Sequence, residues 1–180
     1  MSVLDRPKVH VQLEHNVNME KLIVYLAGAI NGCTDEQAKD WREYVKTAYP
    51  QYSYLDPMRN DYRGRENEPG IDAEIVEGDK ADIAESDIML VNYDKPSVGT
   101  SMEVFYATSI GRPVIVVARP DTVISPWLKY HSTVIVPSFA EAFAKIAEIE
   151  KEYRESFDVF EDEVSGIVAN VSELFSTVLK

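Results

Sequence analysis

The sequence predicts an α/β fold, a doubly wound parallel sheet of five strands with helices on both faces, as in flavodoxin-like and Rossmann-like proteins. The alternation of two kinds of segment leads to this prediction. Short β-branched and aliphatic runs, apolar on both faces, alternate with amphipathic helical patterns between about residues 21 and 150. This alternation implies βαβ units with right-handed crossovers, in which ligands bind at the carboxyl ends of the strands. A functional site is therefore expected in the loops that follow the strands.

Five apolar runs are the expected strands. Each is short, continuous and followed by polar or turn-forming residues, as expected for a strand that is buried on both faces. In chain order they are Leu22–Ala27, Tyr52–Leu55, Ile88–Tyr93, Val114–Ala118 and Val134–Val136.

The first two helices are expected over Asp35–Tyr49 and residues 71–85. The first follows Thr34 and has Gln37 three residues further on, which is the pattern of a capping box. The second has isoleucine and valine side chains at helical spacing, which indicates one buried face.

The last two helices of the alternating region are expected over residues 100–110, between two glycines, and over Phe139–Glu150, after a proline.

We expect residues 1–20 to be an N-terminal extension, 21–150 the α/β domain and 151–180 a C-terminal helical extension. Apolar residues from Phe157 to Val178 recur every three or four positions, which predicts an amphipathic helix. This helix packs either on its own domain or on a second subunit, and the expected state is a homodimer or a larger homo-oligomer.

Composition excludes several classes of function. The chain has 18 basic and 31 acidic residues and a net charge of −13, which argues against a nucleic-acid polymer or an anionic membrane as partner. One cysteine, Cys33, and three histidines make a metal centre a poor expectation. The first strand does not run into the G-x-G-x-x-G fingerprint, so no dinucleotide cofactor is expected. With neither a signal-peptide pattern nor a span of about 20 apolar residues, the expected location is the cytoplasm.

The most informative segment runs from Asn92 to Ala107, where a buried strand turns through a short loop into a helix. Ser97, Gly99 and Thr100 supply hydroxyl and free N–H groups at the start of that helix, a natural cradle for an oxyanion or a phosphate. Glu103 is expected in its first turn, at the mouth of the sheet. The alternative for Glu103 is an acid that only complements the helix dipole.

The ends of the first two strands carry further candidates. Gly28 lets a ligand approach the backbone after the first strand, and Asn31 follows in the same loop. Tyr25 is either a packed strand aromatic or a site residue. Arg59 and Arg63 lie after the second strand, and arginine suits a phosphate, although solvent-facing arginines are common in loops.

Two more segments complete the candidate set. Asp79 and Asp82 lie on one helical face. They either form a solvated acidic face or supply a carboxyl group that handles a nucleobase proton. Ser125 lies in the loop expected after the fourth strand.

Together these segments resemble the nucleoside 2-deoxyribosyltransferase family and its relatives, the nucleoside 5′-monophosphate N-glycosidases, over roughly residues 22 to 150. The resemblance rests on the order and spacing of Tyr25-Leu-Ala-Gly28, Asp79 ahead of Asp87-Ile-Met-Leu, Gly99-Thr-Ser-Met-Glu103, Tyr106-Ala and Gly111-Arg-Pro-Val-Ile. It implies that Glu103 is the nucleophile that attacks the sugar C1′ and forms a glycosyl-enzyme. It implies that Tyr25 orients this carboxylate and that Asp79 contacts the base and helps to protonate it. The acceptor is then a second base or water.

Ser97 distinguishes two branches of this resemblance. The transferases that act on free nucleosides commonly have an acid at this position, whereas the monophosphate-cleaving relatives have a serine that binds phosphate. Ser125 matches a second phosphate-binding serine that those relatives take from a neighbouring subunit. Ala29 departs from the pattern, because one relative has a serine there, and Arg59 or Arg63 is the expected compensation.

The resemblance therefore implies sugar transfer between bases first, with monophosphate hydrolysis as the alternative. A phosphoribohydrolase of the lysine-decarboxylase-like type is disfavoured, because the loop before Thr100 is too poor in glycine. A nucleotide-binding module without catalysis is the alternative from another class.

Overall fold

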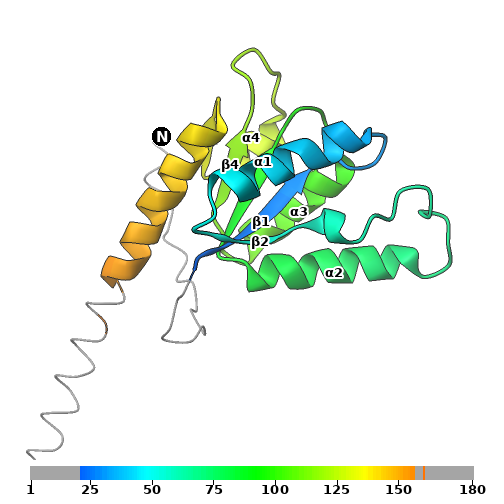
Figure 1. The fold of residues 1–180 in the computed structure, drawn as a ribbon, viewed down its shortest axis with the longest axis horizontal. Helices are drawn as coiled ribbons and strands as arrows, with labels where there is room; N and C mark the ends of the chain where they lie inside the picture. Colours follow the sequence, from blue (N-terminus) through cyan, green and yellow to red (C-terminus); the bar gives the residue numbers. More distant parts are fainter. Residues whose placement is uncertain (1–20, 157–159, 161–180) are drawn as a thin grey trace, which may run out of the picture. The chain divides into compact units, whose positions relative to one another are not determined.

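The computed structural model describes residues 21–156 and residue 160, and it confirms the predicted sheet. Five parallel strands lie in the order β2-β1-β3-β4-β5. Figure 1 shows the whole fold, with α2 running along one side of it. Every strand falls within one residue of its predicted bounds. The strands are β1 (Ile23–Gly28), β2 (Ser53–Leu55), β3 (Ile88–Asn92), β4 (Val114–Val117) and β5 (Val134–Val136).

The strand order reverses between β1 and β3. From β1 the chain first adds β2 on one side and then returns to add β3 on the other, with Gly28 opposite Asn92 at the end of the pair. The carboxyl ends of these two strands therefore flank the topological switch point, where ligands bind in open α/β sheets.

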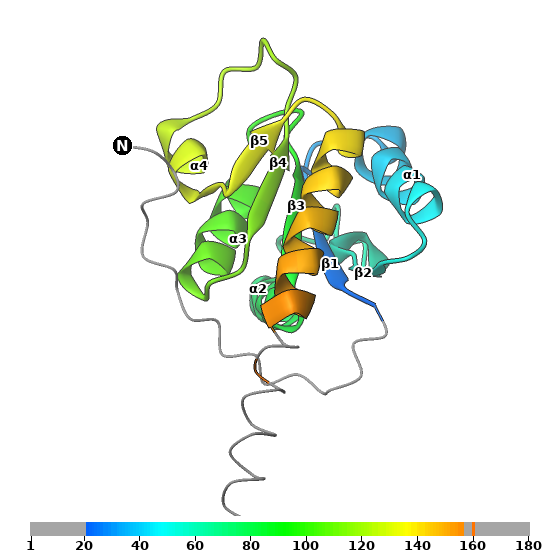
Figure 2. The same cartoon turned by 90° about the vertical axis from the view of Figure 1, so that its left-hand side faces the viewer.

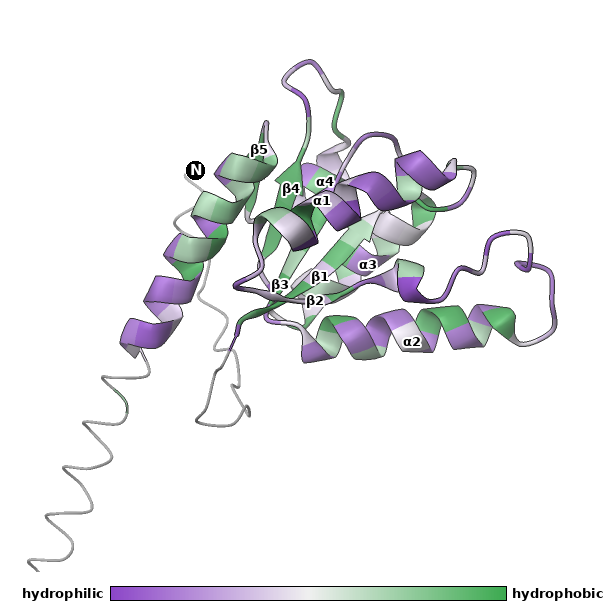
Figure 3. Ribbon diagram, in the orientation of Figure 1, coloured by the Kyte–Doolittle hydropathy of each residue, from purple (hydrophilic) through white to green (hydrophobic). Residues whose placement is uncertain are grey.

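Helices cover both faces of the sheet, as predicted (Figure 2). On one face, α2 (Ile71–Glu85) and α3 (Val98–Ser109) bury a core that includes Tyr25, Met89 and Val104. On the other face lies α1 (Trp41–Ala48), where Trp41 stacks on Phe139 at a centroid distance of 5.8 Å. Hydropathy follows this arrangement, with apolar strands enclosed by helices that carry hydrophilic residues (Figure 3).

Local signals explain most helix starts. Thr34 and Gln37 exchange the two hydrogen bonds of the predicted capping box, at 3.0 and 3.3 Å, although the helix first runs as a π-helical turn, η2 (Glu36–Asp40). The α2 bounds match the prediction. The α3 helix begins two residues earlier than predicted, because the Ser97 hydroxyl caps it by accepting from the Thr100 N–H. Glu103 is therefore in the second turn, and the expectation of a first-turn position was wrong.

Two short helices occupy segments that were predicted as loops. They are η3 (Pro57–Arg59) and α4 (Pro126–His131). In both, a proline occupies the start of the helix and the residue before it, Asp56 or Ser125, accepts a backbone N–H through its side chain. Ser125 is thus a helix cap.

The last described helix covers residues 139–156, longer than the predicted 139–150. The chain divides after Phe143 into two compact units. Within the second unit, Phe160 is helical and 61% exposed, and the rest of the predicted apolar stripe lies outside the described residues, as do residues 1–20. None of the described helices combines the length and the apolar character needed to span a bilayer.

Candidate active site

A cavity of about 270 Å³ opens at the carboxyl ends of β1 and β3, beside the start of α3. Eight of the predicted site residues line it. Tyr25 is not a lining residue, but its hydroxyl donates a hydrogen bond to Glu103, which is one. Arg59 and Ser125 are not among the lining residues. The lining residues are Gly28, Ile30, Asn31, Pro57, Asn60, Tyr62, Arg63, Glu66, Ile75, Asp79, Ser97, Gly99, Thr100 and Glu103.

Glu103 is the most constrained group in this cavity. The fully buried Tyr25 donates its hydroxyl to Glu103 Oε1 at 3.2 Å. The other oxygen, Oε2, is buried and has no hydrogen-bond partner among the described residues. A buried, unpartnered carboxylate oxygen destabilises the fold, which makes Glu103 the first candidate for a functional group in this cavity.

Burial and like charge set the protonation of this site. Burial, followed by the nearby charge of Asp79, raises the pKa of Glu103 to about 7, while Tyr25 and Arg42 oppose the rise. Burial and then Asp82 raise the pKa of Asp79, against Tyr25 and Arg59. Burial is also the main cause of the raised pKa of Tyr25, which stays protonated and donates. Such a pair of carboxyl groups is able to hold a single proton near neutral pH.

Asp79 and Asp82 differ despite lying on one helical face. Asp79 lines the cavity, whereas Asp82 is 8% exposed and forms an ion pair with Arg59. Neither is part of a freely solvated face. The Arg59 guanidinium is thereby directed to α2.

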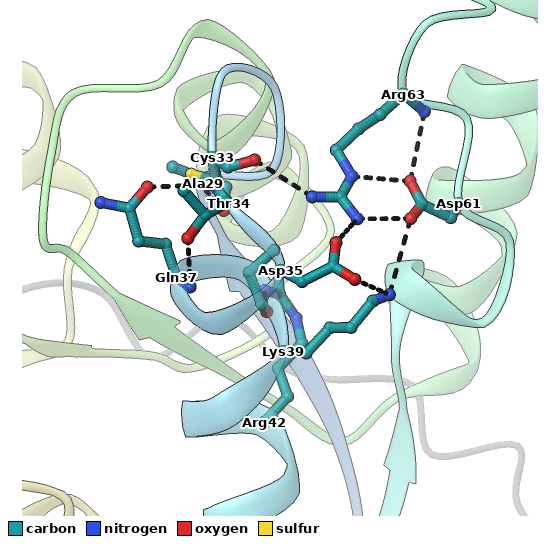
Figure 4. Close-up of polar contacts among 10 residues, drawn as sticks. Ala29, Cys33, Thr34, Asp35, Gln37, Lys39, Arg42, Asp61 and Arg63 are labelled. Atoms are coloured by element: carbon teal, nitrogen blue, oxygen red, sulfur yellow. Dashed lines mark hydrogen bonds and ion pairs between the residues drawn. The ribbon is translucent and has the colours of Figure 1, made fainter.

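Arg63 belongs to an ion-pair clasp made of Asp35, Lys39, Asp61 and Arg63 (Figure 4). Its guanidinium contacts Asp35 and Asp61, both at 2.5 Å, and donates to the Cys33 carbonyl at 3.1 Å. Lys39 completes the clasp with Asp35 at 3.0 Å. The clasp joins the loop after β1 to the loop after β2, and both loops line the cavity. Compensation by Arg59 or Arg63 for a missing phosphate ligand stays a prediction, since each guanidinium already has a carboxylate partner.

The start of α3 presents polar groups to the cavity as predicted. The Ser97 oxygen accepts from Thr100, and the hydroxyl still has a proton to donate to a ligand. Ser125 lies instead on a second, apolar cavity with Phe105 and Trp127. Its expected action on a neighbouring subunit's site stays a prediction.

Sequence reasoning missed two residues beneath the site, Trp41 and Arg42. A Cβ atom on Gly28 would stand 3.0 Å from Trp41 Cζ2 and 3.2 Å from the Asn92 carbonyl oxygen, so this glycine serves close packing as well as the cavity wall. Arg42 is fully buried and donates to the Gly28 carbonyl at 3.2 Å. Its place in a polar-looking stretch of helix gave no signal of burial.

In the described part of the chain, no cluster of three or more acidic, histidine or cysteine side chains is arranged to hold a metal ion.

Comparison with known proteins bears on the family and the fold. The family model described as nucleoside 2-deoxyribosyltransferase matches residues 24–169. A search of curated proteins gave no match. A 2-deoxyribosyltransferase from Bacillus psychrosaccharolyticus is similar in structure, with a TM-score of 0.56 and 18% identity over 66% of this chain and 88% of that one.

Two further solved structures are similar at lower scores. A conserved protein from Enterococcus faecalis has a TM-score of 0.47 and 14% identity over 64% of this chain and 82% of that one. A CMP N-glycosidase from Clostridium botulinum has a TM-score of 0.46 and 16% identity over 69% of this chain and 98% of that one.

Proposed function

The chain belongs to the nucleoside 2-deoxyribosyltransferase family, and from this premise we propose that it cleaves the N-glycosidic bond of 2′-deoxynucleosides and transfers the sugar to another base. One observation supports this most strongly. Glu103 has one oxygen held by Tyr25 and the other buried and unpartnered, in a cavity that Asp79 also lines. That is the arrangement needed for a carboxylate nucleophile beside a carboxylic acid.

The first step starts from the reactive form of the pair, in which the single proton lies on Asp79 and Glu103 is ionised. Glu103 Oε2 attacks C1′ and forms an ester bond to the sugar. The C1′–N bond breaks, and its electron pair goes to the base nitrogen system, which takes the proton of Asp79. Protonation matters because a neutral base leaves more readily than an anion from an oxocarbenium-like state.

In the second step, a nitrogen of the acceptor base attacks C1′. The ester bond breaks and its electron pair returns to Glu103, while the proton of the acceptor nitrogen goes to the Asp79 carboxylate. Both carboxyl groups are then back in their starting forms. Throughout, the Tyr25 hydroxyl holds Oε1 and so aims Oε2 at the sugar.

A second candidate is a nucleoside 5′-monophosphate N-glycosidase with water as the acceptor. Ser97 favours it, because a hydroxyl at the start of α3 can donate to a phosphate, whereas an acid there would repel it. Water then attacks C1′ of the glycosyl-enzyme, the ester bond breaks and returns its electron pair to Glu103, and the proton of the water goes to Asp79.

We also propose that the protein self-associates. Large apolar side chains are exposed on α3 and α4: Met102 at 63%, Phe105 at 47% and Trp127 at 72%. Burying such a patch in a second copy removes apolar surface from water. Light scattering at micromolar concentration tests this, and a monomeric mass contradicts it.

A chromatographic product assay tests the proposed reaction. Each 2′-deoxynucleoside and its 5′-monophosphate is incubated with and without an acceptor base. A new nucleoside that appears only with acceptor supports transfer, and free base with sugar phosphate in its absence supports the hydrolase. Glu103→Gln should remove either activity, whereas Glu77→Gln, in an exposed pair with Lys80, should keep it. Nucleoside binding without any product would leave a non-catalytic nucleotide-binding module.

A further inference from the structure

The cavity has two chemically different sides. At the start of α3 it is lined by hydroxyl and backbone N–H groups and by Glu103. The opposite side is formed by the segment after β2 and by α2. It includes the apolar side chains of Tyr62 and Ile75 and the polar side chains of Asn60 and Glu66. None of these four residues has a role in the proposed reaction.

Tyr62 places a fixed aromatic ring on this second side. Its hydroxyl donates to Glu74 Oε1, in the first turn of α2, at 2.9 Å, and its carbonyl oxygen accepts from the Arg65 N–H at 3.0 Å. The residues before and after it, Asp61 and Arg63, form an ion pair within the clasp. The ring is half-buried and already held in place, so little conformational freedom is lost when a flat ligand packs against it.

Ile75 extends the same apolar surface along α2. It lies one helical turn before Asp79, and both side chains line the cavity. Four residues of α-helix rise by about 6 Å, so Ile75 lies about that far beyond Asp79 along the helix axis. Ile75 also follows Glu74, the residue that holds the Tyr62 hydroxyl. The segment that carries Tyr62 lies beside the beginning of α2 (Figure 1), where the helix is apolar (Figure 3).

We propose that Tyr62 and Ile75 form a platform for the outer ring of a purine, so that purine 2′-deoxynucleosides are the preferred substrates. This rests on the proposed function, in which Glu103 attacks C1′ and Asp79 protonates the base. A base in that position has its sugar at Glu103 and an acceptor nitrogen at Asp79. A purine then extends one ring further along α2, onto the platform, where its face stacks on the aromatic ring. A pyrimidine is one ring shorter and covers less of the platform.

The polar residues of this side suit the edge of a base. The Asn60 amide both donates and accepts, and the Glu66 carboxylate accepts from ring N–H and exocyclic amino groups. An apolar platform bordered by such groups has the composition of a nucleobase site, in which stacking provides affinity and the edge provides orientation.

Nucleoside binding to the Glu103→Gln protein tests the proposal, because the ligand stays intact without the nucleophile. Isothermal titration calorimetry compares 2′-deoxyadenosine and 2′-deoxyinosine with 2′-deoxycytidine and thymidine. The purine nucleosides should bind about tenfold more tightly. Added Tyr62→Ala should weaken purine binding by about 5- to 100-fold and pyrimidine binding much less. Added Tyr62→Phe should keep most of the purine preference, because it keeps the ring.

Val76→Ala is the matched control, because Val76 follows Ile75 on α2 but is 52% exposed and is not among the lining residues. It should leave both affinities unchanged. Binding that does not favour purines, no binding at all, or an equal loss for both classes in Tyr62→Ala would overturn the proposal. Should Tyr62→Ala fail to fold by circular dichroism, Ile75→Ala supplies the test. It should weaken purine binding alone, by several-fold, and an equal loss or none would overturn the proposal.

Turnover separates this proposal from the proposed function. If purines are preferred in binding and Tyr62→Ala removes that preference, but the unmodified protein releases no base, the proposed function fails and the platform stands. If nucleosides are cleaved with the same kcat/KM for purines and pyrimidines, the platform fails and the proposed function stands.

Discussion

Two groups of charged residues border the same cavity, and the pKa values of their carboxyl groups are shifted in opposite directions. In the clasp, Arg63 lowers the pKa of Asp61 to about 2, and Lys39 and Arg63 lower the pKa of Asp35. In the pair formed by Glu103 and Asp79, burial raises both pKa values, that of Glu103 to about 7. The clasp carboxylates have cations as direct partners, whereas Glu103 has a phenol and an unpartnered oxygen.

The difference separates two roles at one cavity. The clasp holds the loops at its edge in place, and the pair formed by Glu103 and Asp79 is able to react. Paired charges at the surface tie two loops together and keep the same charge state over a wide range of pH. Buried carboxyl groups without a direct cation remain able to exchange a proton near neutral pH, as acid and nucleophile chemistry requires. The five predictions below test this division.

The largest effect is expected for Glu103→Gln. The amide is nearly isosteric but cannot act as the nucleophile, so turnover should fall by about 10⁴-fold or more. The product assay measures this loss. Unaltered turnover in a folded Glu103→Gln protein would rule out Glu103 as the nucleophile.

Asp79→Asn should lower kcat for ordinary nucleosides by about 10²- to 10⁴-fold, because the leaving base is no longer protonated. A 7-methylguanine deoxynucleoside carries a positive charge on the base, which leaves as a neutral molecule without a new proton. Its cleavage should be far less affected by the substitution. Equal losses for both substrates would place Asp79 outside proton transfer.

Arg63→Met tests the clasp. Freed loops bind substrate less well but leave Glu103 and Asp79 in place, so KM should rise roughly tenfold with kcat little changed. Arg65→Met is the matched control, because Arg65 pairs with Glu68 on the same loop. A fall in kcat at constant KM would contradict the division of roles between the clasp and the pair formed by Glu103 and Asp79.

Ser97→Asp should shift preference from the monophosphate towards the free nucleoside by several-fold, because a carboxylate at the start of α3 repels a phosphate. The ratio of kcat/KM for the two substrates measures the shift. A constant ratio removes Ser97 from any phosphate site.

The smallest effect concerns stability. The folded-state pKa of Glu103 lies above its ordinary value of 4.5, so the folded protein loses stability as pH rises between about 4.5 and 7. Glu103→Gln should relieve up to about 3 kcal/mol of this cost at about pH 8 and little of it at about pH 5. Thermal melting of both proteins at the two pH values measures this. Equal stabilisation at both pH values would mean that ionisation of Glu103 does not destabilise the folded protein.

Local patterns in the sequence predicted the strands, the capping box at Thr34 and the cluster around Glu103. They succeeded because apolar runs and caps depend on neighbouring residues, and because parallel strands bring their carboxyl ends together. The clasp could not be predicted, since Asp35 and Arg63 are far apart in sequence and meet only through tertiary folding. Arg42 was missed for the same reason, because an arginine on a short helix ordinarily faces water.

Covalent trapping tests most directly whether Glu103 is the nucleophile. A nucleoside of 2′-deoxy-2′-fluoroarabinose slows the release of the sugar, because fluorine destabilises the oxocarbenium-like state. Peptide mass spectrometry of the treated protein should find the fluorosugar on Glu103 and no adduct at that peptide in Glu103→Gln. An adduct on another residue, or the same adduct in Glu103→Gln, would contradict the role of Glu103.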